Sequence, residues 1–444
     1  LLLVIFLTFG NVAQVSAAFR GSGMSVDFER VISVSDGPEP ADEEPPVEEP
    51  AEPGDELVPI EEPAEPIDEV VEPEDEAPDA EIFAPDTGWY GDGTATEFYI
   101  GTVAELEGLD QLVTGGTTFA GKTIYLTADI NLQGTSFAPI GTKDRAFSGT
   151  FNGQNHTLSN LDLTQDTNHA GFFARIDEGS VKNLNVDNFD INAPEYAGAV
   201  AGQMFRASIE NVHISNSTIL SDHFGGGVTG HLYGNAKNSS VTDVEVLAHN
   251  DLPGELGNKL GGLAGYVGEG AYVLENNTGT RVTVTGVRDV GGLFGTTNAN
   301  NKVYNNTITD SEVTASDEHG TETNAWAGGI VGRLNGASTT FRWNVNNNTT
   351  VASYGEGQAG PIYGGPAANA IDLRVHNETQ DAWYTTITAA VTAAVDGDVI
   401  RAGAGTYDEE DILINKSIEL YGAANHTSII APSGATNNST IKVG

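Results

Sequence analysis

Apolar and polar residues alternate in short stretches along the middle of the chain. In SIENVHIS (208–215), Ile209, Val212 and Ile214 are apolar between polar residues, with one break in the alternation. Alternation with a period of two is typical of half-buried β-strands, and a break filled by Asn, Asp, Ser or Gly is typical of a turn. Such strands and turns are predicted at 180–191, 208–219, 240–248, 280–286, 302–315 and 339–352.

A glycine-rich motif separates these stretches and recurs along the chain. Its copies are AGFFA (170–174), AGAVAG (197–202), GGGVTG (225–230), LGGLAG (260–265), VGGLFG (290–295), AGGIVG (327–332) and AGPIYG (359–364). Successive copies end 28 to 37 residues apart, which is the period of a repeat architecture. A unit with two or three short strands cannot bury its own apolar face, but stacked copies can. We therefore predict an all-β fold, a solenoid of the parallel β-helix type.

The motifs themselves are predicted to be corners of the solenoid wall. In VGGLFG, the bulky pair Leu293 and Phe294 should straddle the wall with at least one side chain inside. The glycines should turn the chain sharply and let neighbouring backbones approach closely. A phosphate-binding loop is disfavoured, because no Lys-Ser/Thr pair and no helix follow. The predicted corner glycines are Gly171, Gly202, Gly230, Gly265, Gly295, Gly332 and Gly364.

The array needs a cap at its first coil. Val103, Leu106, Leu109 and Val113 have helical spacing, which predicts a short capping helix over 103–113. A first strand is expected over 121–132 and a first full turn of wall over 146–163.

The same order of elements returns near the C-terminus. An amphipathic helix is predicted over 382–396, followed by alternating strands. The sequence stops in the middle of this pattern, about 60 residues after it begins, which predicts a second, truncated β-helix and a part of a longer polypeptide.

Composition divides the chain further. An apolar run followed by small residues predicts a partial signal peptide at 1–17, with a membrane anchor as the alternative. The region 36–86 holds 22 Asp and Glu and no Lys or Arg, which predicts a disordered linker. The predicted segments are 1–17, a mature N-terminal segment 18–35, the linker 36–86, the repeat array 87–380 and the second β-helix 381–444.

The formal net charge is −44, and the chain has no cysteine. Disulfides and thiolate metal sites are therefore excluded. A negative field of this size disfavours nucleic acid and anionic lipid as partners.

The glycine motifs, each followed by a strand such as VKNLNV, resemble the GLUG repeats of exported bacterial proteins, including IgA-protease-like metallopeptidases and large adhesins. The opening TIYLTADINLQGTSFAPIGTKDRAFSGTFNGQNHTLSNL is similar to the start of the β-helical domains that carry those repeats. This resemblance covers about 97–370. Residues 382–444 resemble the first coils of pectin-lyase-like proteins. The resemblance implies a right-handed β-helix exported to the cell surface.

Candidate catalytic or metal-binding residues are sparse. The His-Glu-x-x-His motif of a zinc peptidase is absent. His223 and His231 flank one glycine motif without an obvious third ligand. Acids that recur on the predicted wall, and that a polysaccharide-cleaving enzyme would need, are Asp162, Asp187, Asp190, Glu210, Asp243 and Glu245. The basic candidates are Arg206, Arg281, Arg288, Arg333 and Arg342. We interpret the acids as solvated wall residues; no catalytic or cofactor site is assigned, and calcium at acidic turns is a minor alternative.

Asn-x-Ser/Thr sequences also recur in the array. The candidate glycosylation sites are Asn155, Asn216, Asn238, Asn276, Asn305, Asn347 and Asn377, although Asn is also a common turn residue. Thr283 and Thr285 form one pair of the kind that orders water on ice-binding solenoids, which is too little to predict that function.

The leading hypothesis is a secreted or cell-surface, non-enzymatic stalk or adhesin, with carbohydrate or a host-surface molecule as the candidate ligand. Two alternatives stay open. One is a polysaccharide lyase or glycoside hydrolase with its site on the wall. The other is the non-catalytic β-helical part of a larger exported peptidase.

Overall fold

The computed structural model describes residues 3–5, 17–19, 84–164, 168–248, 258–316, 325–354, 358–403, 405–409, 412–422, 428–430 and 441–443. The predicted signal peptide, N-terminal segment and linker lie outside these residues, with two exceptions. Strand β1 (Leu3–Ile5) pairs antiparallel with β2 (Ala17–Phe19), and residues 84–86 join the folded array. Within the described part of the chain, no helix is long and apolar enough to cross a membrane.

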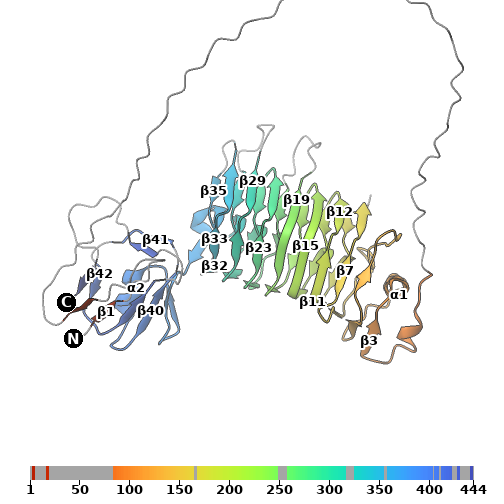
Figure 1. Ribbon diagram of the computed structural model, residues 1–444, viewed down its shortest axis with the longest axis horizontal. Helices are drawn as coiled ribbons and strands as arrows, with labels where there is room; N and C mark the ends of the chain where they lie inside the picture. Colours follow the sequence, from red (N-terminus) through yellow and green to blue (C-terminus); the bar gives the residue numbers. More distant parts are fainter. Residues whose placement is uncertain are drawn as a thin grey trace, which may run out of the picture. The chain divides into compact units, whose positions relative to one another are not determined.

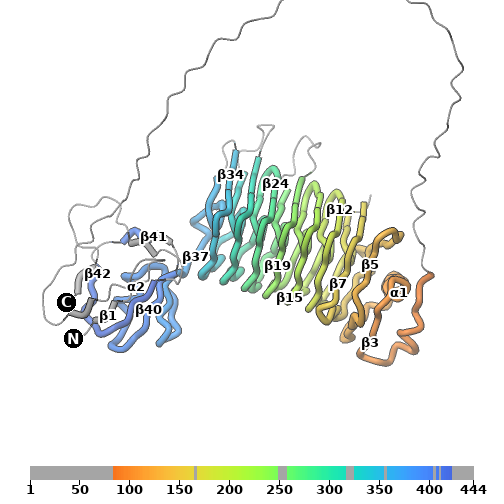
Figure 2. The backbone as a smooth tube through the Cα atoms, viewed as in Figure 1, coloured from red at the N-terminus to blue at the C-terminus, as the bar shows by residue number. Residues whose placement is uncertain are grey.

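The repeat region is a parallel β-helix, as predicted (Figure 1). Each coil adds one strand to each of two seven-stranded sheets and pairs in parallel with the coils before and after it. The tube in Figure 2 shows the coils stacked along one axis from yellow to light blue.

The first seven-stranded sheet contains β9 (His169–Ala170), β13 (Tyr196–Gly198), β16 (Phe224–Gly226), β20 (Lys259–Gly261), β25 (Asp289–Gly291), β30 (Trp326–Gly328) and β35 (Gln358–Gly360). The second contains β10 (Phe173–Asp177), β14 (Ala201–Phe205), β17 (Thr229–Tyr233), β21 (Ala264–Val267), β26 (Phe294–Asn298), β31 (Val331–Asn335) and β36 (Tyr363–Gly365).

A 21-stranded sheet forms the rest of the wall. Its strands are β3 (Glu97–Ile100), β4 (Thr123–Leu126), β5 (Ile130–Asn131), β6 (Thr150–Asn152), β7 (Thr157–Ser159), β8 (Asp162–Thr164), β11 (Ser180–Asp187), β12 (Asp190–Ala193), β15 (Ser208–Ser221), β18 (Ala236–Lys237), β19 (Ser240–Leu247), β22 (Val273–Glu275), β23 (Thr278–Thr280), β24 (Thr283–Gly286), β27 (Lys302–Tyr304), β28 (Thr307–Thr309), β29 (Glu312–Ala315), β32 (Thr339–Arg342), β33 (Val345–Asn347), β34 (Thr350–Ser353) and β37 (Ala370–Asp372).

The apolar positions of the alternating stretches stack into inward-facing rows. One row contains Val181, Ile209, Ala236, Leu274, Val303 and Phe341 in register. All six side chains are buried. Stacked coils bury these apolar side chains against one another, whereas a single repeat unit would leave them exposed.

The breaks in the alternation are corners with a left-handed backbone. Seven successive coils of this wall each have two such residues, with φ between 45° and 66°. The first column contains Asn155, Asn183, Asn211, Asn238, Asn276, Asn305 and Trp343; the second contains Asn160, Asn188, Asn216, Asp243, Arg281, Asp310 and Asn348. Asn and Asp tolerate this conformation better than other residues with a Cβ, which explains the asparagine-rich composition.

Buried asparagines form a ladder just inside the first column. The Nδ2 of Asn277 donates to the Oδ1 of Asn306 at 2.9 Å, and the Nδ2 of Asn306 donates to the Oδ1 of Asn344 at 3.0 Å. Asn277 and Asn306 are fully buried. Each amide is satisfied by the coils next to it, so these polar residues fix the register of the stack.

The glycine motifs form the tight bend between the two seven-stranded sheets. Both Leu293 and Phe294 are fully buried, which goes beyond the prediction that at least one is inside. A Cβ added to Gly295 would lie 2.7 Å from the backbone N and O of Leu260 in the preceding coil. The predicted close approach is therefore confirmed. None of the seven predicted corner glycines has a positive φ, so the bend is made without a left-handed backbone at these positions.

The predicted capping helix is α1 (Val103–Thr114). Leu106, Leu109 and Val113 are buried, and Val103 packs at the edge of the core. A 3₁₀ turn, η1 (Gly88–Tyr90), and β3 precede the helix and were not predicted. Trp89 packs edge-on against Phe98 of β3, with ring centroids 5.7 Å apart, so the end of the core is closed by aromatic side chains.

The N-cap of α1 offers a first prediction. Thr102 Oγ1 accepts from the Glu105 backbone N, and the Glu105 carboxylate accepts from the Gly101 N at 2.8 Å. Thr102→Ala is expected to lower the free energy of unfolding by about 1 kcal/mol, because it removes the cap. Urea-induced unfolding checks this value. Gln111→Ala, an exposed change on the same helix, serves as the control; an equal loss in both variants would contradict the role of the cap.

A second core begins at Val375. It contains α2 (Ile387–Ala393) and a four-stranded sheet of β38 (Val375–Asn377), β39 (Ala382–Tyr384), β40 (Val399–Ala402) and β43 (Glu419–Tyr421). Further parallel pairs are β41 (Gly405–Tyr407) with β44 (Ser428–Ile430) and β42 (Ile412–Ile414) with β45 (Ile441–Val443). Parallel pairing of successive strands agrees with the start of a second β-helix.

Two details of this region differ from the predictions. The boundary expected between 380 and 381 falls inside the sheet, because β38 already pairs with β39 and β40. The helix expected over 382–396 is shorter, because residues 382–384 form β39, where Trp383 stacks on His376. The helix begins only after Thr386, whose Oγ1 accepts from the Ala389 N.

A short 3₁₀ turn, η2 (Ala367–Asn369), lies between β36 and β37 at the end of the array.

Candidate functional site

The predicted wall acids are placed on the 21-stranded sheet with different neighbours. Asp162 and Asp190 are directly opposed on β8 and β12. Burial, and secondarily the Asp162 carboxylate, raise the pKa of Asp190. Glu245 lies in the same row but is separated from Asp190 by Thr218. Asp162 and Asp190 are therefore the only two of the six predicted acids that the register places side by side.

Two of the remaining acids form hydrogen bonds with neighbouring side chains, and Glu210 has a lysine opposite it on each adjacent coil. Asp187 accepts from Ser215 and Asn216, each at 2.7 Å. Glu210 is opposed by Lys182 and Lys237 on the two adjacent coils, and Asp243 forms a two-pronged pair with Arg281 at 2.6 Å. These contacts fit the interpretation of wall residues that match one coil to the next.

The predicted basic residues are divided between two places. Arg206 pairs with Glu178 at 2.9 Å, and Arg342 lies over the rings of Tyr304 and Trp383. Arg288 and Arg333, in contrast, both approach the buried Asp289. The latter group is part of the seam described below.

The candidate glycosylation sites lie mostly at the left-handed corners. Asn155, Asn216, Asn238, Asn276 and Asn305 all have positive φ. The Nδ2 of Asn276 donates to the Oδ1 of Asn238 at 3.1 Å, so these amides already form a ladder. Asn347 lies in β33 and Asn377 is buried. Glycosylation stays a prediction, and turn formation accounts for the asparagines.

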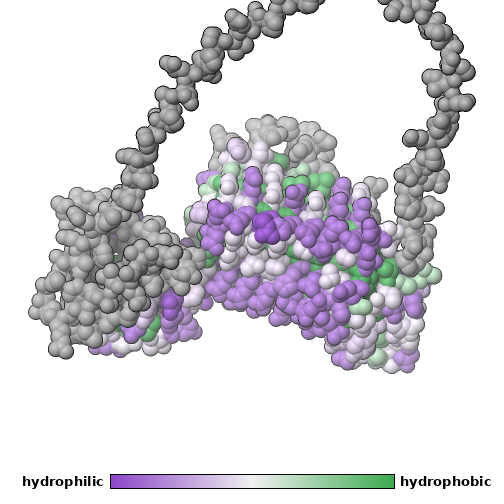
Figure 3. Space-filling view, in the orientation of Figure 1, coloured by the Kyte–Doolittle hydropathy of each residue, from purple (hydrophilic) through white to green (hydrophobic). Residues whose placement is uncertain are grey.

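The outer face of the 21-stranded sheet is hydrophilic in the view of Figure 3. A shallow pocket of about 340 Å³ lies on it, lined by residues that include Thr157, Asp187, His213 and Thr242. Thr283 and Thr285 face outward on β24, but Glu245 and Glu312 flank Thr283 in its row. Charged neighbours therefore interrupt the row of Thr283, whereas Thr285 is opposed by Thr314 in its own row.

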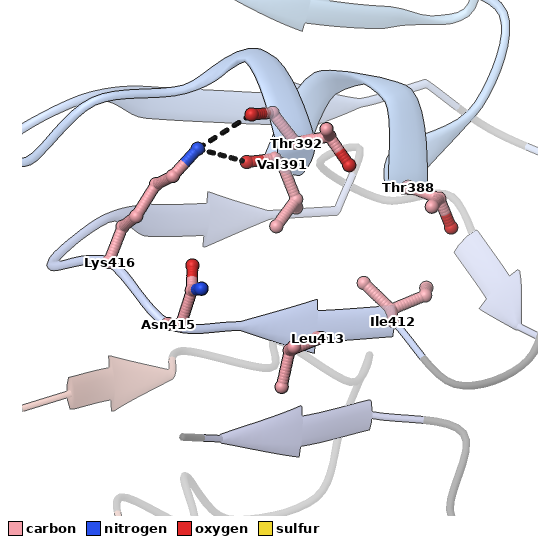
Figure 4. Close-up of a pocket in the computed structure, with 7 residues that line it drawn as sticks. All are labelled: Thr388, Val391, Thr392, Ile412, Leu413, Asn415 and Lys416. Carbon is pink, nitrogen blue, oxygen red and sulfur yellow. Dashed lines mark hydrogen bonds between the residues drawn. The ribbon is translucent and has the colours of Figure 1, made fainter.

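A second pocket, of about 310 Å³, lies between α2 and β42 (Figure 4). Lys416 Nζ donates to the carbonyl oxygens of Val391 at 3.3 Å and Thr392 at 2.6 Å. The ammonium group therefore caps the C-terminal end of the helix, where a positive charge is stabilising. The charge of Lys416 in this pocket is therefore explained by its structural role at the end of α2.

The most distinctive side-chain arrangement follows the bend between the two seven-stranded sheets. The residue before each glycine motif and the residue after it face each other across the bend. We call these two rows the seam: His169, Tyr196, Phe224, Lys259, Asp289 and Trp326 on the first sheet, and Arg175, Gln203, His231, Tyr266, Thr296 and Arg333 on the second.

Aromatic rings occupy the first half of the seam. Tyr196 and Phe224 are stacked with ring centroids 5.0 Å apart, and the His231 ring lies parallel to both at 5.7 and 5.2 Å. Gln203 Nε2 donates to His231 Nδ1 at 3.2 Å. Because an amide nitrogen only donates, His231 Nδ1 accepts and the neutral ring carries its proton on Nε2. Burial lowers the pKa of His231 to about 3.

Charged residues occupy the second half. Asp289 is fully buried and accepts from Thr296 Oγ1 at 2.7 Å. Arg333 Nη1 lies 3.7 Å from Asp289 Oδ2, and Arg288 Nε lies 3.9 Å from Asp289 Oδ1. Burial raises the pKa of the Asp289 carboxyl, while Thr296 and the three nearby cations oppose the shift. Lys259 Nζ lies 5.0 Å from the centre of the Phe224 ring.

Several polar atoms in the seam, and one of the adjacent Arg288, lack a hydrogen-bond partner among the described residues. The donors are the Nε of Arg175, Arg288 and Arg333, His231 Nε2 and Trp326 Nε1; the acceptor is Asp289 Oδ1. Buried polar atoms normally form hydrogen bonds. A group of unpaired polar atoms beside aromatic rings is therefore typical of a ligand-binding surface.

Three residues of this region were already candidates from the sequence. His231, Arg288 and Arg333 were candidates, but as scattered metal-binding or wall residues. The structure places His231 and Arg333 in the second row of the seam and Arg288 next to Asp289 of the first row, while His223 lies outside both rows. Among the described residues, no three His, Asp or Glu side chains lie close enough to hold a metal ion.

Comparison with known proteins finds similarity that is low in sequence identity or confined to a small part of the other protein. No family model matches the chain. Halomucin of Haloquadratum walsbyi is 31% identical over 125 residues, which is 25% of this chain and 1% of halomucin, so the chain spans about one hundredth of that relative. A candidate immunoglobulin A1 protease from Bacteroides ovatus aligns with 74% of this chain and 84% of its own, at 16% identity and a TM-score of 0.39. A structure named IgA1 protease aligns with 75% of this chain and 25% of its own, at 13% identity and a TM-score of 0.30.

Proposed function

We propose that this chain is an exported, non-enzymatic adhesin whose β-helical array presents the seam as an extended binding face for carbohydrate. The observation that supports the proposal best is the seam itself. Aromatic and basic side chains follow one another over six coils, at the strand spacing of about 4.8 Å. A regular face of this kind suits a long, repetitive ligand. The apolar run at 1–17 supports export to the cell surface.

The binding proposal is tested with the full chain on neutral and acidic polysaccharides, with calcium and with a chelator. Retention of the chain by at least one glycan, without new reducing ends, is the expected result. Release of reducing ends that the chelator abolishes would favour the polysaccharide-cleaving alternative. No retention by any glycan would contradict adhesion to carbohydrate and leave a structural stalk.

One observation favours the enzymatic alternative. Asp162 and Asp190 are opposed on neighbouring strands, and the pKa of Asp190 is raised. Two neighbouring carboxyl groups, one of which has a raised pKa, are the usual acid and base of a glycoside hydrolase. If the assay above detects cleavage, Asp190→Asn should abolish it, and unchanged cleavage would exclude this pair.

A further inference from the structure

The charged half of the seam is positive within a strongly negative protein. Lys259, Arg288 and Arg333 surround the single carboxylate of Asp289. The whole chain has only 19 Lys and Arg against 63 Asp and Glu. Three cations around one buried acid therefore form a positive patch on a protein whose net charge is negative. The negative potential of the rest of the protein would repel a polyanion.

The unpartnered atoms of the seam are mainly donors. Arg288 and Arg333 each have an Nε without a hydrogen-bond partner among the described residues, and Trp326 Nε1 lacks one too. The side chains of Arg288 and Arg333 are 26% and 27% exposed, so solvent reaches part of each. A ligand that contacts the exposed parts of these two side chains must supply acceptors, and a planar carboxylate matches a guanidinium group best.

Aromatic rings adjoin these donors. Trp326 follows Asp289 in the first row, and Tyr266 precedes Thr296 in the second. Both aromatic side chains are partly exposed. A ring that is apolar on its face and polar at its tip packs against the apolar face of a sugar.

We propose that the seam around Asp289 binds the carboxylate-bearing sugars of an acidic glycan, with Arg333 and Arg288 on the carboxylate and Trp326 against the sugar ring. This inference rests on the proposed function and names the ligand class of the same face.

The test measures the affinity of the full chain for a polyuronate oligosaccharide and for a neutral oligosaccharide of equal length by calorimetry. A sulfated oligosaccharide distinguishes carboxylate recognition from attraction to any anion. The polyuronate is expected to bind at least tenfold more tightly than either of the others. Arg333→Gln should reduce polyuronate affinity at least tenfold, with Lys259→Gln as a second variant if the first does not fold.

Arg281→Gln is the matched control, because Arg281 is an exposed arginine paired with Asp243 on the outer wall. It should bind as the parent does. Equal binding of neutral and acidic oligosaccharides, or parental affinity in folded Arg333→Gln, would overturn the acidic-glycan inference but keep the adhesin. Binding of no oligosaccharide or polysaccharide would overturn both.

Discussion

Gly295→Val is expected to prevent the central coils from folding as one array. The side chain would have to occupy space already filled by the backbone of the preceding coil, where Gly265 O and the N and O of Leu260 lie. Backbone atoms cannot change rotamer, so the two seven-stranded sheets would have to separate. We expect a loss of about 3 kcal/mol or more in the free energy of unfolding, measured by urea-induced unfolding, and new proteolytic cleavage within 258–316.

Gly121→Ala separates this steric effect from backbone strain. Gly121 has a φ of +71° and open space around the position that a Cβ would take. Its replacement should cost only about 1 kcal/mol, the strain of a left-handed residue. If Gly295→Val costs no more than Gly121→Ala, the close approach of the coils is not the reason for the glycine motif.

The period of the motifs was enough to predict the architecture, because each coil repeats both its apolar row and its bend. Ile209, Val212 and Ile214 are all buried, and the break between Ile209 and Val212 is Asn211 at a φ of +54°. The close approach of backbones at the motif glycines was predicted correctly, but these glycines have no positive φ. Sequence spacing shows where a glycine recurs, but not whether it supplies a positive φ or room for a neighbouring backbone.

The seam was not predicted, because its chemistry changes from coil to coil. Phe224, Lys259, Asp289 and Trp326 occupy one row but share no residue type. A search for repeated residues therefore misses them. A usable signal does exist: the residue before and the residue after each motif face each other across the bend, whatever their identity. Arg288, adjacent to that row, was a candidate only as one of several dispersed arginines.

The seam depends on the bend, and this links the fold to the proposed binding face. Asp289 and Thr296 stand on either side of VGGLFG and are joined by a hydrogen bond of 2.7 Å. Any side chain that separates the two sheets would also separate these two rows. Variants of the motif glycines are consequently expected to lose ligand binding together with stability, whereas Arg333→Gln should lose binding alone.

His231 makes the array sensitive to acid. Its ring is 8% exposed and packs among Tyr196, Phe224 and Tyr266. Burial, followed by the charges of Lys259 and His169, lowers its pKa to about 3. In the unfolded chain a histidine takes up a proton near pH 6.5. Below that pH the unfolded state binds a proton that the folded state does not, so acid favours unfolding.

His231 alone is expected to lower the free energy of unfolding by about 2 to 3 kcal/mol when the pH falls from 7 to 4.5. Acidic residues titrate in the same range, so the informative quantity is the difference between the parent and His231→Gln at each pH. Glutamine is the residue that the preceding coil has in this row, at Gln203. The variant should gain stability relative to the parent as the pH falls, by urea-induced unfolding, while His156→Gln controls for loss of an outer-wall histidine. If the stability difference between His231→Gln and the parent is constant with pH, the His231 ring accepts a proton in the folded chain as readily as in the unfolded chain. That result would remove the argument for a neutral Nε2–H donor in the seam.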